Sequence, residues 1–204
     1  MGTFIRIFFL GLFIFLLANG KAMLWFALIA GGLLLALIFG RVYCAYVCPM
    51  NTLMIPAELL SKKLGIQAES KPKWLKNGYF TWIALLLSIA AMLLLRKMLH
   101  FELPILPLWV IISVIVTLRF KPAVFHNLIC PFTGLFRSFG QFGRLSKRVD
   151  PDTCIGCKLC ENVCPSDAIT VFTDDKKAAI DIALCHQCTN CAEVCPKSSI
   201  YYGK

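Results

Sequence analysis

The sequence predicts an α-helical membrane domain of four transmembrane helices, joined to a small α+β domain that is rich in cysteine. The 204-residue chain is 58% hydrophobic and has a mean hydropathy of +0.73, which is typical of integral membrane proteins. Most apolar residues precede position 120, whereas eight of the eleven cysteines follow position 150. We therefore expect a transmembrane domain over 1–120, a linker over 121–148 and a compact extramembrane domain over 149–204.

Four apolar runs account for the expected membrane domain. They cover approximately residues 3–18, 22–40, 79–99 and 104–119. A helix needs about 20 residues to cross the hydrocarbon core, so the first and fourth runs are short but workable with flanking residues. A helix also pairs every backbone N–H and C=O within the segment, as lipid requires. The short connections after the first and third runs predict two helical hairpins.

Lysine and arginine are unevenly divided between the two sides of these runs. The loop after the second run carries Arg41, Lys62, Lys63, Lys71, Lys73 and Lys76. The segment after the fourth run carries Arg119, Lys121, Arg137, Arg144, Lys147 and Arg148. The opposite side has Lys21, Arg96 and Lys97. The positive-inside rule places both termini in the cytoplasm and the chain in the inner membrane. Orientation in a lipid bilayer thus accounts for the formal charge of +10, and we expect no nucleic-acid partner because no reading motif is present.

The two expected hairpins are repeats of one another. An offset of 82 residues aligns "VYCAYVCPMNTL" with "VFHNLICPFTGL". Cys48 and its proline then match Cys130 and its proline, whereas Cys44 matches His126. Both motifs lie at the cytoplasmic end of the second helix of a hairpin. If the helix continues through the first motif, Cys44 and Cys48 are four residues apart and face the same way.

The predicted linker contains phenylalanines among basic residues. Its sequence from 131 to 148 is "PFTGLFRSFGQFGRLSKR". This composition suits an amphipathic segment that lies on the inner leaflet of the membrane. The segment could equally pack on the C-terminal domain.

The C-terminal region contains "CIGCKLCENVCP" and, 31 residues later, "CHQCTNCAEVCP". This spacing indicates metal or cluster ligands rather than a disulfide framework, and a thiolate site could in principle hold zinc. The pattern resembles bacterial two-cluster ferredoxins over about residues 149–203. The resemblance implies one [4Fe–4S] cluster on Cys154, Cys157, Cys160 and Cys195. It implies a second on Cys164, Cys185, Cys188 and Cys191.

Three β-prone stretches, "ITVF", "AAIDI" and "SIYY", separate or follow the cysteine motifs. They predict a small duplicated α+β fold with its two clusters close enough to exchange electrons. His186 lies inside the second motif. We expect it to be exposed or to support the ligands, because the cysteines already suffice.

Nearly the whole chain resembles the NapH-type membrane ferredoxins, and it is also similar to the membrane half of NosR-type proteins. "GRVYCAYVCPMN", "HNLICPFTGLF" and the eight-cysteine segment carry the resemblance. It implies an electron-transfer subunit of a membrane oxidoreductase complex, working with other subunits. Such a subunit relays electrons between a quinone pool, or a partner subunit, and a soluble donor or acceptor. Alternatives are a non-catalytic redox sensor or maturation scaffold, and a transporter or thiol relay.

The second membrane motif departs from the resemblance, because it has His126 where a cysteine is expected. Imidazole replaces thiolate in some iron–sulfur sites. We therefore hypothesise a third iron–sulfur centre on Cys44, Cys48, His126 and Cys130. The alternatives are that the three cysteines are buried small hydrophobic residues beside helix-stopping prolines, or that they form a disulfide or bind zinc. His100 and Glu102 could handle quinol protons at the opposite membrane face.

Overall fold

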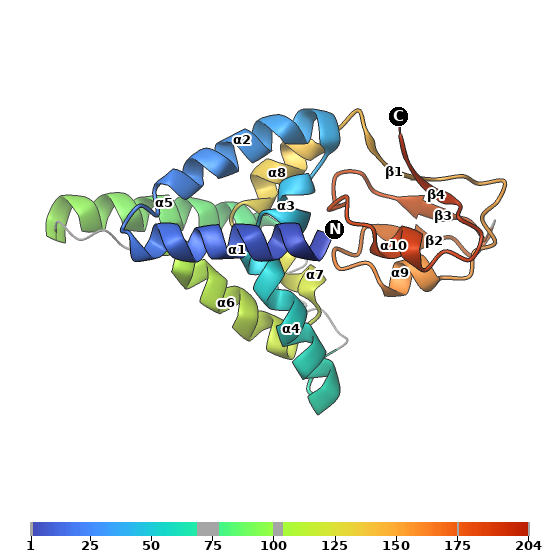
Figure 1. The fold of residues 1–204 in the computed structure, drawn as a ribbon, viewed down its shortest axis with the longest axis horizontal. Coiled ribbons are helices and arrows are strands. Elements are labelled where there is room, and N and C mark those ends of the chain that lie inside the picture. The colour runs from blue at the N-terminus through green and yellow to red at the C-terminus, as the bar shows by residue number, and fades with distance from the viewer. Residues whose placement is uncertain (1, 69–77, 100–103, 175, 204) are drawn as a thin grey trace. The chain divides into compact units, whose positions relative to one another are not determined.

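The computed structural model describes residues 2–68, 78–99, 104–174 and 176–203 (Figure 1). The chain forms two compact units, each made from two stretches of sequence. Unit 1 comprises Met1–Phe26 and Cys48–Gly134, and unit 2 comprises Ala27–Val47 and Leu135–Lys204. These units do not follow the predicted boundaries at residues 120 and 148, because residues 27–47 group with the C-terminal residues. Each unit is described by itself.

Unit 1 is built from apolar helices that pack around α4 and α6. Its described elements are α1 (Gly2–Ala18), α4 (Pro49–Leu64), α5 (Tyr79–Leu99), α6 (Ile105–Arg119), α7 (Pro122–Val124) and the π-helix η2 (Phe125–Ile129). The most extensive contact joins α4 to α6. There the Ser61 hydroxyl donates to the Leu118 carbonyl at 2.7 Å. Trp109 Nε1 donates to Ser88 Oγ at 3.0 Å and links α6 to α5.

Unit 2 combines a long helix with a small α+β domain. Its elements are most of α2 (Leu24–Phe39), α3 (Val42–Tyr46), most of α8 (Thr133–Gly140), β1 (Ser146–Val149), α9 (Leu159–Asn162), β2 (Ile169–Val171), β3 (Ala178–Ile180), α10 (Asn190–Glu193) and β4 (Ile200–Gly203). In the described residues, β1 pairs with β4 and β2 pairs with β3, both antiparallel (Figure 1). The predicted α+β class of this region is confirmed.

The α+β domain is an internal duplication with a 31-residue offset. That offset carries β1 onto β3, α9 onto α10 and β2 onto β4. The β2–β3 pair therefore matches the β4–β1 pair, so each pair joins one strand from each half. The buried core has the same symmetry, since Cys160 and Ile169 match Cys191 and Ile200. Neither half can complete its sheet or its core alone.

The four predicted apolar helices are present, but only one has the length of a membrane span. Within the described residues, Tyr79–Met98 is long and apolar enough by length and composition to cross a membrane, with a mean hydropathy of 1.9. The apolar helices α1, α2 and α6 have 17, 16 and 15 residues. Four transmembrane spans are therefore not supported by helix length.

The cysteine motif after α2 is not one continuous helix, so that premise of the sequence analysis is wrong. Helix α2 ends before Gly40, which has a φ of +68°. Helix α3 is a separate short turn, and Cys48 then adopts an extended conformation with φ −67° and ψ 119°. The proline after Cys48 disfavours helical backbone at that residue. Cys44 and Cys48 therefore do not share a face of one helix.

The predicted linker is also more structured than a segment lying on a leaflet. Pro122, Ala123, Val124, Phe125 and His126 are all buried. Its last residues, Ser146–Val149, form β1 of the α+β domain. The β4 strand needs this partner for its backbone hydrogen bonds, so the domain begins at Ser146 rather than at residue 149. The alternative reading, that the segment packs on the C-terminal domain, holds for β1.

Candidate functional site

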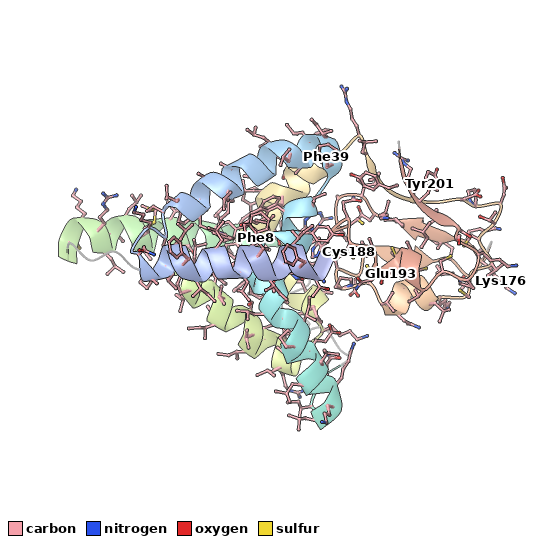
Figure 2. The ribbon with its side chains drawn as sticks, viewed as in Figure 1. Phe8, Phe39, Lys176, Cys188, Glu193 and Tyr201 are labelled. Atoms are coloured by element: carbon pink, nitrogen blue, oxygen red, sulfur yellow. The ribbon has the colours of Figure 1, made fainter. Side chains whose placement is uncertain are left out.

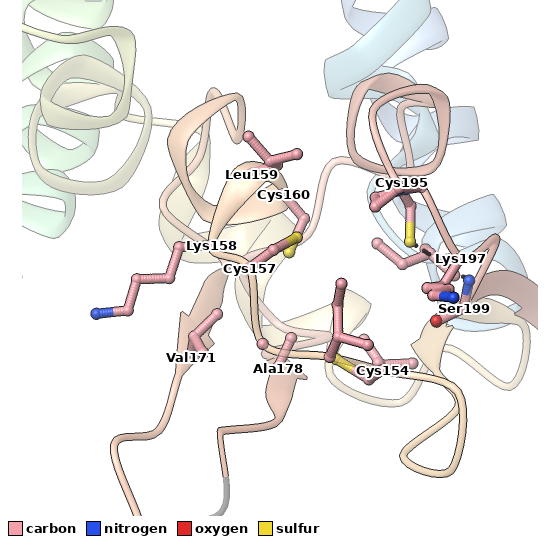
Figure 3. A pocket seen from close by; sticks show the side chains of 15 residues that line it. Cys154, Cys157, Lys158, Leu159, Cys160, Val171, Ala178, Cys195, Lys197 and Ser199 are labelled. Atoms are coloured by element: carbon pink, nitrogen blue, oxygen red, sulfur yellow. Dashed lines mark hydrogen bonds between the residues drawn. The ribbon is translucent and has the colours of Figure 1, made fainter.

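Four cysteines line one cavity in unit 2. The cavity is bounded by Cys154, Cys157, Cys160 and Cys195 (Figure 3). The first three come from the loop before α9 and from α9 itself, whereas Cys195 follows α10 in the other half of the duplication. Lys158 and Lys197 are the charged side chains of this lining. The thiols predicted for the first cluster thus lie together.

The other four cysteines of the α+β domain are also neighbours. Burial, together with nearby Cys188, Cys164 and Cys191, raises the pKa of the Cys185 thiol to about 12. Burial, with Cys188 and Cys164, likewise raises the pKa of Cys191 to about 11. Because charges interact strongly only at short range, these mutual effects place Cys164 among the three cysteines of the second motif. This is the set predicted for the second cluster.

Backbone N–H groups point at the sulfur of the last cysteine in each motif. The Ala168 N–H donates to Cys164 Sγ at 3.3 Å, and the Ser199 N–H donates to Cys195 Sγ at 3.4 Å. These two contacts are equivalent under the 31-residue offset. At Cys195, burial raises the pKa, but the N–H donors of Ser199 and its neighbours outweigh burial and lower it overall. Such donors stabilise the thiolate that an iron atom requires.

The arrangement of the thiols suits a cluster better than a single ion. A tetrahedral zinc site needs four ligands that converge on one point at about 2.0–2.3 Å. Within the described residues, no group of three or more His, Cys, Asp or Glu side chains is placed to hold one metal ion. In an iron–sulfur cluster the thiolates bind different iron atoms and surround the group. The cysteine-lined cavity fits that second geometry.

Two residues at or near the second cluster-binding loop, Gln187 and Arg41, were missed by sequence reasoning. Gln187 has a φ of +61°, at the position where the first half has Gly156 with a φ of +64°. Its Oε1 accepts the Lys147 N–H at 2.8 Å. Arg41 is fully buried, and its Nη1 lies 3.4 Å from the carbonyl oxygens of Ala183 and Leu184. The mismatch of glutamine with glycine between the repeats was a signal in the sequence.

His186, which lies inside the same loop, is not exposed. Its side chain is 1% exposed. The eight cysteines of the domain suffice as cluster ligands, and the supporting role predicted for His186 stays a prediction.

In unit 1, Cys48 and Cys130 have the same backbone conformation. Cys48 has φ −67° and ψ 119°, and Cys130 has φ −58° and ψ 121°. Each precedes a proline, which disfavours helical dihedral angles at the preceding residue. The two copies of the 82-residue repeat therefore break their helices at the same place. Cys130 is buried and Cys48 is partly buried.

His126 is held at both its ring and its backbone. It is 3% exposed, and its Nε2 lies 3.1 Å from Asn51 Oδ1. The Thr133 hydroxyl donates to the His126 carbonyl. Asn51 and Thr133 are equivalent positions of the 82-residue repeat, and the role of Asn51 was not predicted. When a neighbouring group fixes one ring nitrogen of a histidine, the other ring nitrogen points in a defined direction.

Cys44 belongs to unit 2, whereas the other three residues of the hypothesised third centre belong to unit 1. The Cys44 thiol is buried, and burial raises its pKa, while the Arg41 guanidinium acts in the opposite direction. All eleven cysteines are free, so the disulfide alternative is not present. The centre formed by Cys44, Cys48, His126 and Cys130 stays a prediction.

A second cavity lies in unit 1, among the ends of apolar helices. It has a volume of about 200 Å³, and Arg96 is the charged residue of its lining. The remaining walls are apolar and come from Leu17, Gly20, Ala22, Met23, Phe26, Met92, Pro104, Ile105, Leu106 and Pro107. His100 and Glu102, proposed from the sequence to handle protons, lie outside the described residues.

Comparison with known proteins agrees with both repeats. Residues 153–199 match a family described as a 4Fe–4S dicluster domain. Residues 21–67 and 103–149 each match a family described as a 4Fe–4S binding domain. The two latter segments are separated by the 82-residue offset found in the sequence. The repeat prediction is confirmed, and so is the binding of two [4Fe–4S] clusters.

Two relatives are similar to this chain over part of their length. An uncharacterized protein of Methanocaldococcus jannaschii is 29% identical over 138 residues, which are 65% of this chain and 54% of that protein. The methylamine utilization ferredoxin-type protein MauN of Paracoccus denitrificans is 28% identical over 152 residues, 69% of this chain and 53% of MauN. The chain therefore spans about half the length of these relatives. No solved structure matches. Together these matches show that the chain is similar to ferredoxin-type iron–sulfur proteins.

Proposed function

We propose that this chain is a membrane-bound electron-transfer subunit. It relays electrons between a quinone pool, or a partner subunit, and a soluble redox partner. The observation that carries this proposal is the pairing of two four-cysteine sets in one duplicated domain, on a chain whose other helices are apolar and expose large hydrophobic side chains. Reduction of both clusters by a quinol or by a soluble low-potential donor is the expected result. Clusters that neither donor reduces would instead favour the sensor or scaffold.

The ligand sets follow from the neighbours described above. Cys154, Cys157, Cys160 and Cys195 would hold one cluster, and Cys164, Cys185, Cys188 and Cys191 the other. Each set would take its fourth thiolate from the opposite half. When bound, the clusters supply one-electron redox chemistry, while the protein supplies the thiolates, the N–H donors and the shielding from water.

Single substitutions can test this exchange of ligands between the halves. Cys195→Ala should remove the same electron paramagnetic resonance signal as Cys154→Ala, and Cys164→Ala the same signal as Cys185→Ala. Each variant should lose about four iron atoms per chain. If Cys195→Ala instead matched Cys185→Ala, each cluster would be held within one half.

Exposed apolar surface supports insertion in a bilayer. The span Tyr79–Met98 is 11% buried over its most apolar window. Helix α1 exposes Phe4, Ile7 and Phe8, and Phe8 is labelled in Figure 2. A helix of 16 residues is about 24 Å long, against about 30 Å of hydrocarbon. Local thinning and flanking residues can accommodate that difference at modest cost. We therefore propose that the shorter helices also span the inner membrane, with both termini in the cytoplasm.

Fractionation and topology reporters test this arrangement. The chain should stay with membranes after an alkaline carbonate wash. A fluorescent protein fused at the C-terminus should fold in the cytoplasm, whereas a periplasmic alkaline phosphatase fused there should be inactive. Recovery of the washed chain in the soluble fraction would contradict the proposal.

The third centre on Cys44, Cys48, His126 and Cys130 is proposed from the repeat. Each of the two segments that match the 4Fe–4S binding family contains one pair of these residues. Asn51 fixes one ring nitrogen of His126. Iron counted per purified chain decides it. Two [4Fe–4S] clusters require about eight iron atoms, and a third centre raises the count to about ten or twelve. A count of about eight iron atoms per chain would rule out the third centre.

The unit 1 cavity is where a quinone ring would bind. Its apolar walls suit a lipid-soluble ring, and the Arg96 side chain can donate to a carbonyl oxygen. Arg96→Ala should weaken quinol-dependent reduction of the clusters and leave reduction by dithionite unchanged. Lys97→Ala is the matched control, since Lys97 is the neighbouring basic residue and is not part of the lining. Equal loss in both variants would place the quinone elsewhere.

A further inference from the structure

The duplicated domain allows its two cluster-binding loops to be compared position by position. In the first loop, Ile155 is 55% exposed and Cys157 is exposed. The equivalent residues of the second loop are His186, which is 1% exposed, and Cys188, which is 8% exposed. The two loops have the same fold and the same ligand spacing. What differs is that the second loop is covered.

The segment at and just after the C-terminal end of α2, which belongs to the same compact unit, contacts residues of and beside this loop. The Arg41 guanidinium contacts the carbonyl oxygens of Ala183 and Leu184, the two residues before Cys185. A Cβ atom on Gly40 would lie 2.8 Å from Gln187 Nε2, so the α2 end and this loop are in close contact. The residue before β1 also contacts the end of α2, because the Leu145 N–H donates to the Ile38 carbonyl at 2.8 Å.

Gln187 shows that this cover is specific to the second loop. A left-handed backbone is strained for a non-glycine residue, and the first loop avoids that strain with Gly156. At Gln187 the side chain compensates by accepting the Lys147 N–H from β1. The first half has no side chain at this position. The second loop is therefore adapted to contact the rest of unit 2, and the first loop is not.

Arg41 places a permanent positive charge beside the covered loop. Guanidinium stays protonated in proteins, and the side chain is fully buried. Charges act more strongly in a low-dielectric interior than in water. Adding an electron to a thiolate-bound cluster makes it more negative, and burial alone disfavours that change. A buried cation opposes the effect of burial and raises the reduction potential.

We propose that the two clusters have different places in the electron path: the second is the inner, covered cluster, and the first is the outer, exposed cluster. Arg41 is a positioning residue that raises the reduction potential of the second cluster. This inference rests on the ligand sets proposed above. A soluble donor or acceptor then meets the exposed first loop. The Arg41 guanidinium also acts on the Cys44 thiol, so it joins the covered loop to the first cysteine motif.

A redox titration of the full chain, followed by electron paramagnetic resonance, tests the role of Arg41. Ser166 Oγ lies 3.6 Å from Cys164 Sγ, so Ser166→Ala marks the signal of the second cluster by shifting its midpoint potential. Arg41→Gln should make the midpoint of that same signal more negative, and Arg41→Lys should largely restore it. Arg144→Gln, at an exposed arginine of the same unit, should leave both midpoints unchanged.

A shift of the other signal, or of neither, would overturn the inference. If Arg41→Gln does not assemble its clusters, Gly140→Ala decides, because its Cβ would lie 2.9 Å from Arg41 Cγ and displace that side chain. It should move the second signal, and an unchanged signal would overturn the role of Arg41. A water-soluble dysprosium complex should speed the relaxation of the first signal more than the second, and the reverse order would refute the outer and inner assignment. The ligand sets are judged separately by the paired cysteine variants described above.

Discussion

The proline after each membrane-motif cysteine controls the backbone of that cysteine. Cys48 and Cys130 both leave the helical region, because helical dihedral angles there would bring the following proline ring into collision with the chain. Each cysteine therefore lies at a helix boundary, where backbone groups are less fully paired and a side chain can face a ligand. The same reasoning applies to both copies, and for this reason the 82-residue repeat is visible in dihedral angles as well as in sequence.

Gly156 and Gln187 form a natural matched pair for substitution. A Cβ on Gly156 would lie 2.0 Å from the Lys176 carbonyl oxygen, and its φ of +64° is strained for any other residue. Gly156→Ala should destabilise the domain by at least about 2 kcal/mol and reduce iron content. Gln187→Gly should stay within about 1 kcal/mol of the wild type, because relief of strain offsets the lost hydrogen bond.

Thermal unfolding in detergent and iron content measure both variants. The two changes are equivalent in sequence position and opposite in direction. Equal stability of Gly156→Ala and the wild type would contradict the close approach of the Lys176 carbonyl.

Asn51 should stabilise unit 1 through His126. Asn51→Ala leaves the buried Nε2 without the oxygen that lies 3.1 Å away. Loss of a partner from a buried polar group costs about 1–3 kcal/mol. Asn19→Ala is the control in the same unit, since Asn19 is exposed, and it should change stability by less than about 0.5 kcal/mol. Chemical denaturation of both purified variants provides the comparison, and equal midpoints would contradict the role of Asn51.

At the scale of elements, strands and helices are completed by partners that are distant in the chain. β1 ends the segment that the sequence analysis treated as a linker, yet it supplies the only ladder that β4 has in the described residues. Helices α4 and α6 are joined in a similar way by the buried Ser61 hydroxyl, which reaches the carbonyl at the end of α6. Local sequence gives little indication of such contacts because they depend on which elements meet.

Ser61→Ala should loosen the contact between α4 and α6. The hydroxyl is fully buried and its removal leaves the Leu118 carbonyl without that donor. We expect a loss of about 1–2 kcal/mol. Lys63→Ala, an exposed position on the same helix, should cost less than about 0.5 kcal/mol. Thermal unfolding in detergent distinguishes them, and equal losses would show that the hydroxyl contact contributes little.

At the scale of the whole molecule, the metal ligands are also part of the hydrophobic core. Cys160 and Cys191 pack with Ile169 and Ile200 at the centre of the α+β domain. A domain of this size buries too little apolar surface to be stable without additional support. Cluster binding and folding are therefore coupled in this domain.

Removal of iron should unfold the α+β domain and spare unit 1. Oxidative treatment with a chelator is expected to make residues 146–203 sensitive to protease, because thiols freed of iron no longer join the two halves. The helices of unit 1 have their own packing and should stay protected. Mass spectrometry of the fragments provides the readout. Simultaneous digestion of both parts would contradict independent stability.

Patterns of fixed period made most of the fold predictable. The four apolar runs became helices within two residues of their expected ends, and the three β-prone stretches became β2, β3 and β4. The spacing of cysteines identified both clusters, because the ligands of a cluster must come from short loops of set length. β1, Arg41, Gln187 and Asn51 were missed. Each of these owes its role to a partner that lies elsewhere in the chain.

The sequence by itself determined the two repeats, the helical and α+β regions, and the binding of two [4Fe–4S] clusters, since each of these follows from local periodicity or ligand spacing. Only the tertiary structure decided that the two equivalent cluster loops differ in burial. Ligand spacing is the same in both loops, whereas burial depends on what packs against them. The buried Arg41 contacts the two residues before the second loop, and the glutamine that replaces glycine in the second repeat does not by itself show that the end of α2 packs there.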